Sequence, residues 1–295
     1  MNRPRAIFDR QLIRLRLARA ARQEAEEFLL ARAAEELSER LATIKRQFQS
    51  VLDAGTPSPL VATELVERLH PPLLVRMAPL ACLAGPASLL RIVGDEEALP
   101  FAPARFDLAV SALALHNAND LPGALIQLHR VLKPDGLFLG CLLGGRSLHE
   151  LRTALAAAES DIFGGMSPRV APFADVRDMG GLLQRAGFAL PVADSEPLTI
   201  RYDDMFALMR DIRAMGATNA LEARERKPVT KSFFQRAARI YAERFAQADG
   251  RIPATFEMIF LSGWAPHESQ QKPLAPGSAK VRLADVLKTK PLPED

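Results

Sequence analysis

The chain has 295 residues, of which 48% are hydrophobic and 25% are charged, so it contains enough apolar residues for a full globular core. Its net charge of +3 gives no strong case for binding nucleic acid or a membrane surface. Cys82 and Cys141 are too few for a disulfide framework, which suggests a reducing compartment. No apolar run is long enough for a secretory signal or a membrane span. We therefore expect a cytoplasmic protein, for which peripheral membrane association stays open.

The first part of the chain is polar and rich in Arg and Glu, with apolar residues at helical spacing. This pattern predicts an N-terminal helical segment over residues 1–48. Arginines crowd the beginning of this segment and either form a solvated helix face or dock an acidic protein. They are Arg3, Arg5, Arg10, Arg14, Arg16, Arg19 and Arg22.

Short apolar runs then alternate with helical patterns over residues 49–145. This order predicts a mostly parallel sheet with helices on both faces. The predicted strands are residues 50–54, 73–77, 89–93, 106–113 and 137–143, and the predicted helices are residues 60–69 and 121–132. The residues Lys133-Pro-Asp-Gly136 suit a turn into the fifth strand.

The second half of the chain has a looser pattern. It predicts helices over residues 147–158 and 176–186, a strand over residues 189–202 and a last strand over residues 255–263. Two further helices, 203–215 and 231–247, form an insertion at about residues 203–250. We assign residues 49–265 to one domain and 266–295, which carries Pro273, Pro276, Pro291 and Pro293 among polar residues, to a largely disordered tail.

Several phrases resemble the class I S-adenosylmethionine (SAM)-dependent methyltransferases. Residues 51–55 read Val-Leu-Asp-Ala-Gly, residues 94–101 read Gly-Asp-Glu-Glu-Ala-Leu-Pro-Phe, and residues 106–116 are followed by Leu-Lys-Pro-Asp-Gly-Leu-Phe at 132–138. The resemblance implies an α/β, Rossmann-like fold with a seven-stranded sheet, and SAM as the cofactor.

A narrower resemblance covers more of the chain. The phrases at residues 6–10, 116–123, 213–219 and 263–271 are similar to alphaproteobacterial relatives of a mitochondrial complex I assembly factor described as an arginine hydroxylase. This resemblance implies action on a protein, with a subunit of respiratory complex I as the candidate partner.

Four residues are candidates for cofactor binding. Gly55 permits the tight turn that brings backbone amides close to a ligand. Asp95 is placed to accept a hydrogen bond from the adenine amine, or else caps a turn. Asp53 either approaches the cofactor's amino group or is a turn carboxylate, and Leu99 either walls the adenine or belongs to the core.

Two departures from the family pattern affect the same site. Pro57 stands where a second glycine is expected, and proline adds a ring and removes an N–H donor. Arg76 and Met77 stand at the end of the second strand, where an acidic residue should accept hydrogen bonds from the ribose hydroxyls. Fold and cofactor binding are therefore separate expectations.

His116 is the candidate catalytic residue because ligands bind at the carboxyl ends of strands in an open α/β sheet. It is either a base or substrate contact, or part of a loop network. The histidines show no local spacing typical of a metal site, so we predict none. Three hypotheses follow: a SAM-dependent protein methyltransferase, a protein arginine hydroxylase, and a noncatalytic assembly factor on this fold.

Overall fold

The computed structural model describes residues 6–23, 25–83, 85–86 and 88–270. Most of the predicted tail, from residue 271 onward, lies outside the described residues. The helices are α1 (Arg10–Ala20), α2 (Phe28–Ala42), α3 (Leu60–Leu69), α4 (Leu121–Val131), α5 (His149–Phe163), α6 (Val176–Arg185), α7 (Met205–Ala214) and α8 (Lys231–Phe245).

A single seven-stranded sheet runs through the described part of the chain, in the order β3-β2-β1-β4-β5-β7-β6. Strands β1 to β5 pair in parallel, and β7 is antiparallel to both β5 and β6. The strands are β1 (Ser50–Ala54), β2 (Leu73–Ala78), β3 (Leu90–Val93), β4 (Phe106–Ala112), β5 (Leu132–Leu143), β6 (Ala189–Tyr202) and β7 (Ile252–Trp264). The predicted class I methyltransferase fold is confirmed.

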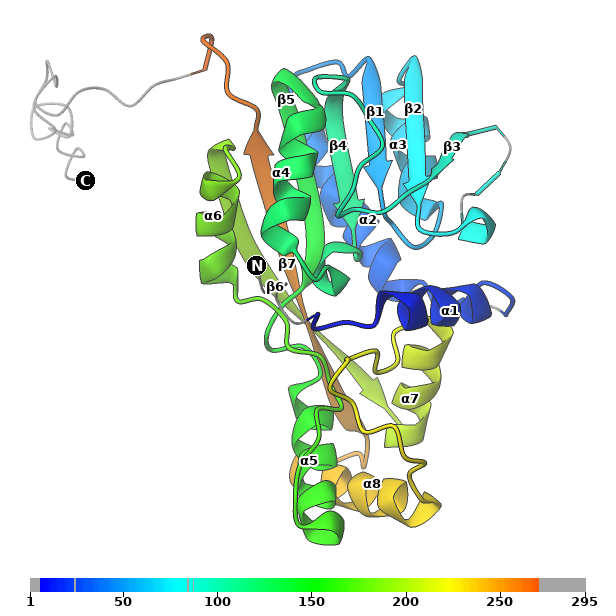
Figure 1. The fold of residues 1–295 in the computed structure, drawn as a ribbon. Coiled ribbons are helices and arrows are strands. Elements are labelled where there is room, and N and C mark those ends of the chain that lie inside the picture. The colour runs from blue at the N-terminus through cyan, green and yellow to red at the C-terminus, as the bar shows by residue number, and fades with distance from the viewer. Residues whose placement is uncertain (1–5, 24, 84, 87, 271–295) are drawn as a thin grey trace, which may run out of the picture.

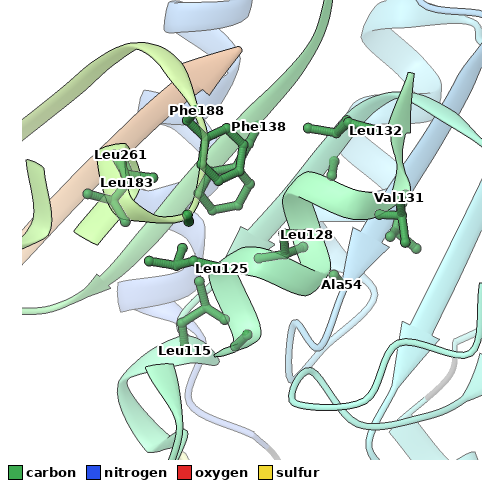
Figure 2. Close-up of a cluster of buried hydrophobic side chains, with 14 of the residues drawn as sticks. Ala54, Leu115, Leu125, Leu128, Val131, Leu132, Phe138, Leu183, Phe188 and Leu261 are labelled. Carbon is green, nitrogen blue, oxygen red and sulfur yellow. The ribbon is translucent and has the colours of Figure 1, made fainter. Parts of the chain in front are cut away.

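Helices cover both faces of the sheet. The apolar sides of α2 and α3 pack on one face, and those of α4 and α6 pack on the other. Figure 2 shows the second packing, where Leu125 and Leu128 of α4 lie near Phe138 of β5 and Leu183 of α6. Burying each such leucine side chain contributes about 1.5–3 kcal/mol. Helix α2 is therefore a layer of the main domain, although its residues fall in the predicted N-terminal segment.

The two predicted helices of the insertion are α7 and α8. Together with α5 they pack around the ends of β6 and β7, forming a third apolar cluster that includes Phe233, Tyr241 and Phe256. Figure 1 shows this group below the parallel part of the sheet, with α1 between the two. The fold thus places α1 at the junction of the sheet and the inserted helices.

Strand β5 differs from its predicted bounds. The turn expected at residues 133–136 lies inside the strand, because Leu132 pairs with Phe106 and Leu137 pairs with Leu108. The intervening residues form an irregularity in which Asp135 has a φ of 61°. The backbone does turn at these residues, as predicted, but the strand pairs with β4 both before and after them.

A buried ion pair joins β1 to β2. Asp53 and Arg76 are register partners on these strands, both side chains have 0% exposure, and the Arg76 guanidinium donates to the Asp53 carboxylate. Arg76 Nη2 also donates to the carbonyls of Thr56 (2.8 Å) and Leu83 (2.9 Å). Burial is the main influence on Asp53 and raises the pKa of its carboxyl, against the opposing effects of Arg76 and Thr56. One arginine therefore fixes the loops that follow both strands.

We expect Arg76→Met to lower the free energy of unfolding by about 3–5 kcal/mol, because it leaves the Asp53 carboxyl buried without its cation. The matched control is Arg201→Met, which removes an ion pair to Asp249 whose side chains are 51% and 44% exposed and should cost less than about 1 kcal/mol. Urea unfolding followed by circular dichroism measures both. Equal losses in the two variants would contradict the role given to Arg76.

Candidate functional site

The loop after β1 makes a close approach to the loop after β4. Gly55 has a φ of +78°, and its N–H donates to the carbonyl of Met77 at 2.9 Å. A Cβ at this position would lie 3.2 Å from Cβ of Ala114, so the position requires glycine for both its backbone conformation and its space. The turn lies at the carboxyl edge of the sheet, where the fold binds ligands.

A cavity of about 600 Å³ opens at this edge. One part of it is lined by Gly55, Pro57, Ser58, Glu96 and Asn117, from loops after β1, β3 and β4. The other part is apolar and is formed by side chains of α1, α5, α7, α8 and β7, including Leu17, Leu151, Ile212, Phe234 and Phe256. The volume suits a small organic ligand or cofactor.

Asp53 is fully buried and is absent from the lining of this cavity. Its two carboxylate oxygens accept from Arg76 and from the Thr56 hydroxyl, which in turn accepts from the N–H of Ala112 at 3.2 Å. Its position matches the interpretation as a turn carboxylate. Strand β2 ends at Ala78, one residue later than predicted, and no acidic residue stands between Ala78 and Leu83.

Asp95 is held by the N-terminal helix. Its Oδ1 accepts from the Glu97 N–H at 3.0 Å and from Arg10 at 2.9 Å, and its Oδ2 accepts from Arg14 at 2.7 Å. Burial raises the pKa of Asp95, but the Glu97 N–H and the two guanidinium groups outweigh it, so the pKa is lowered overall. Leu99, at 5% exposure, packs in the core with the side chains beneath α4.

His116 lines the cavity and lies in a short 3₁₀ turn after β4, over residues 115–117. Its Nε2 lies 3.3 Å from Nδ2 of Asn117, whereas Nδ1 has no hydrogen-bond partner among the described residues. Burial lowers the pKa of His116 to about 4, so its imidazole is neutral at pH 7. Of the five predicted site residues, the structure brings Gly55 and His116 together at the cavity.

The N-terminal arm, residues 6–20, was not recognised from the sequence as part of the site. Arg10 donates to Glu96 at 2.6 Å and to the Asn117 carbonyl at 3.1 Å. The Asn119 side chain accepts from the N–H groups of Ile7 and Phe8 and donates to the Phe8 carbonyl. The spacing of Arg10 and Arg14, one helical turn apart, opposite the acidic run at 95–97 is the signal that could have revealed this contact.

The arm also contacts the segment between α7 and α8. Phe8 forms a β-bridge with Leu221, and Arg16 donates to the carbonyl of Thr218 at 2.5 Å. The arm therefore closes one side of the cavity and is fixed to both of its halves.

Among the described residues, no group of three His, Cys, Asp or Glu side chains is arranged to hold a metal ion. No helix in the described ranges is both long and apolar enough to cross a membrane.

Comparisons with known proteins agree with this geometry. A family model for a methyltransferase domain matches residues 75–140. The mouse protein named arginine-hydroxylase NDUFAF5, mitochondrial, is 39% identical over 97% of this chain and 85% of its own length, and its human counterpart is 37% identical over 96% and 84%. A malonyl-[acyl-carrier protein] O-methyltransferase of Methylovorus sp. (strain MP688) is 34% identical over 95% and 94%.

Solved structures support the fold alone. A structure described as that of a methyltransferase from Bacillus halodurans C-125 aligns with a TM-score of 0.56 at 18% identity, covering 79% of this chain and 99% of that one. Together with the extent of similarity to the two mammalian relatives, these findings show that the chain belongs to the class I SAM-dependent methyltransferase family, within the part of it that includes NDUFAF5.

Proposed function

We propose that this chain is a SAM-dependent methyltransferase that acts on a protein substrate. SAM is the cofactor of the family to which the chain belongs. The observation that carries the proposal is the neutral imidazole of His116 on the wall of the cavity that the Gly55 turn also lines. A cavity at the carboxyl edge, a glycine turn and an uncharged hydrogen-bonding group beside them suit alignment of a cofactor with a nucleophile.

The residues that line the polar part of the cavity fit SAM, except at Pro57 and at the end of β2. Gly55 lines the cavity without a side chain, and Glu96 supplies a carboxylate at the same turn. Pro57 offers no N–H to a ligand, and the end of β2 offers no acid. Of the four predicted cofactor residues we retain Gly55, because Asp53, Asp95 and Leu99 are engaged inside the protein or packed in its core.

When bound, SAM supplies an electrophilic methyl group on a sulfonium sulfur. The contribution of this chain is to position the nucleophile and exclude water. His116 holds the nucleophile by a hydrogen bond, and its lowered pKa keeps it uncharged next to the cofactor's positive charge. Apolar side chains of α5, α7 and α8 line the other half of the cavity, which makes that half unfavourable for water.

A protein substrate is supported by exposed apolar side chains near the end of α5. Ile162, Phe163 and Met166 are 43%, 55% and 74% exposed and close together in sequence, which is typical of a contact surface. The relation to a complex I assembly factor favours a respiratory complex I subunit as the partner. We place the reaction in the cytoplasm, which the two free thiols of Cys82 and Cys141 support.

Arginine hydroxylation is the second candidate, favoured by the name of the mammalian relatives that align over nearly the whole chain. A noncatalytic assembly role is the third, supported by Pro57 and by Arg76, which stabilises the two loops without a ligand. The three candidates predict different chemical modifications of the partner protein: a methyl group, an oxygen atom or none.

The methyltransferase proposal predicts that the partner gains one methyl group. Partner subunits isolated from a strain that lacks this chain should gain the mass of a methyl group when incubated with the purified protein and SAM carrying a deuterated methyl. Mass spectrometry of the peptides measures this gain and locates the modified atom. An arginine that carries one extra oxygen in partner isolated from the parent strain, but not in partner from the strain that lacks this chain, would favour the hydroxylase, and pull-down of an unmodified partner would favour the assembly role.

His116 also predicts a specific pH dependence of stability. The unfolded chain binds a proton at this histidine near pH 6.5 and the folded chain only near pH 4, so its contribution to the free energy of unfolding falls as the pH drops through this window. His116→Asn should remove that part of the dependence, whereas His70→Asn, at an exposed position, should keep it. Denaturant unfolding at several pH values tests this, and identical curves for His116→Asn and the parent chain would refute it.

A further inference from the structure

The part of the cavity that is lined by the loops after β1, β3 and β4 lacks the carboxylate expected at the end of β2. The residues that follow β2, from Ala78 to Leu83, include no acid, and Asp53 is occupied by Arg76 and Thr56. A ligand with two neighbouring hydroxyl groups would find no acceptor at either position. Such a ligand needs a carboxylate acceptor from another part of the cavity lining.

Glu96 is the carboxylate that reaches the glycine turn. It follows β3, its residue exposure is 4%, and its Oε2 lies 3.5 Å from the point where a Cβ on Gly55 would stand. Glu96 lines the cavity, as Gly55 does. The carboxylate therefore faces the same space as the backbone of the turn.

The two oxygens of Glu96 differ in their partners. Oε1 accepts from Arg10 Nη1 at 2.6 Å, whereas Oε2 makes no hydrogen bond within the described ranges of the chain. Oε2 is not among the fully buried polar atoms that lack a partner, so it keeps surface open to the cavity that Glu96 lines, where a ligand donor can reach it. Arg10, whose pKa is raised by its acidic neighbours despite the opposing effect of burial, keeps a positive charge beside Oε1.

We propose that Glu96 accepts the hydrogen bonds of the ribose hydroxyls of SAM, in place of an acid at the end of β2. This inference rests on the proposed function, because it assumes that the cofactor enters this cavity. Arg10 is a positioning residue: it holds Oε1 and leaves Oε2 directed to the ligand side. The N-terminal arm thus takes part in cofactor binding through Glu96.

Isothermal titration of the full chain with S-adenosylhomocysteine tests the proposal. Glu96→Gln should weaken binding by about 10- to 100-fold, the range expected when charge-assisted hydrogen bonds are lost. An analogue that lacks both ribose hydroxyls should bind the parent chain and Glu96→Gln within about twofold of each other. Glu67→Gln, at an exposed position on α3, is the matched control and should bind both ligands like the parent chain.

A second variant covers the case in which Glu96→Gln does not fold. Glu96→Asp keeps the charge but withdraws the oxygens from the Gly55 turn, and it should also lose the preference for the hydroxylated ligand. The proposal is overturned if the parent chain binds S-adenosylhomocysteine while the Glu96 variants bind it equally well, or if these variants weaken both ligands alike. Absence of binding to the parent chain would overturn this inference together with the methyltransferase proposal.

Discussion

The buried pair of Asp53 and Arg76 determines the shape of the carboxyl edge. A guanidinium with 0% exposure needs acceptors, and the Nη groups of Arg76 find them in the Asp53 carboxylate and in the carbonyls of Thr56 and Leu83, whereas its Nε has no partner among the described residues. Those carbonyls belong to the loops that follow β1 and β2. The loops are therefore held by the protein's own groups, and the Gly55 turn keeps its conformation without needing a ligand to organise it.

The N-terminal arm completes the site from the other side. Its arginines neutralise the acidic run after β3, and its backbone is fixed by Asn119. The sheet domain supplies the polar half of the cavity, and the inserted helices supply the apolar half. Because α1 contacts both, the cavity is a product of three segments that are far apart in the sequence (Figure 1).

The fold could be predicted from the sequence because its signals are local. The apolar run before Gly55, the helix that Asp120 caps through the Gly123 N–H and the strand ending at Trp264 each follow from a few neighbouring residues. The candidate site could be predicted only in part. Gly55 and His116 follow from their places at strand ends, but the partners of Asp53, Asp95 and Glu96 are 23 to 86 positions away, and ion pairs across such distances leave no periodic signal.

The attachment of the N-terminal arm to both halves of the cavity has a kinetic consequence. Phe8 is held by Asn119 on the sheet side and by Leu221 on the side of the inserted helices, and Arg10 lines the cavity and donates to Glu96. A ligand that enters past the arm can bind only after these contacts break. Their breaking is a unimolecular step, whose rate does not depend on ligand concentration. The observed rate of association should therefore level off at high ligand concentration, at the rate at which the arm releases.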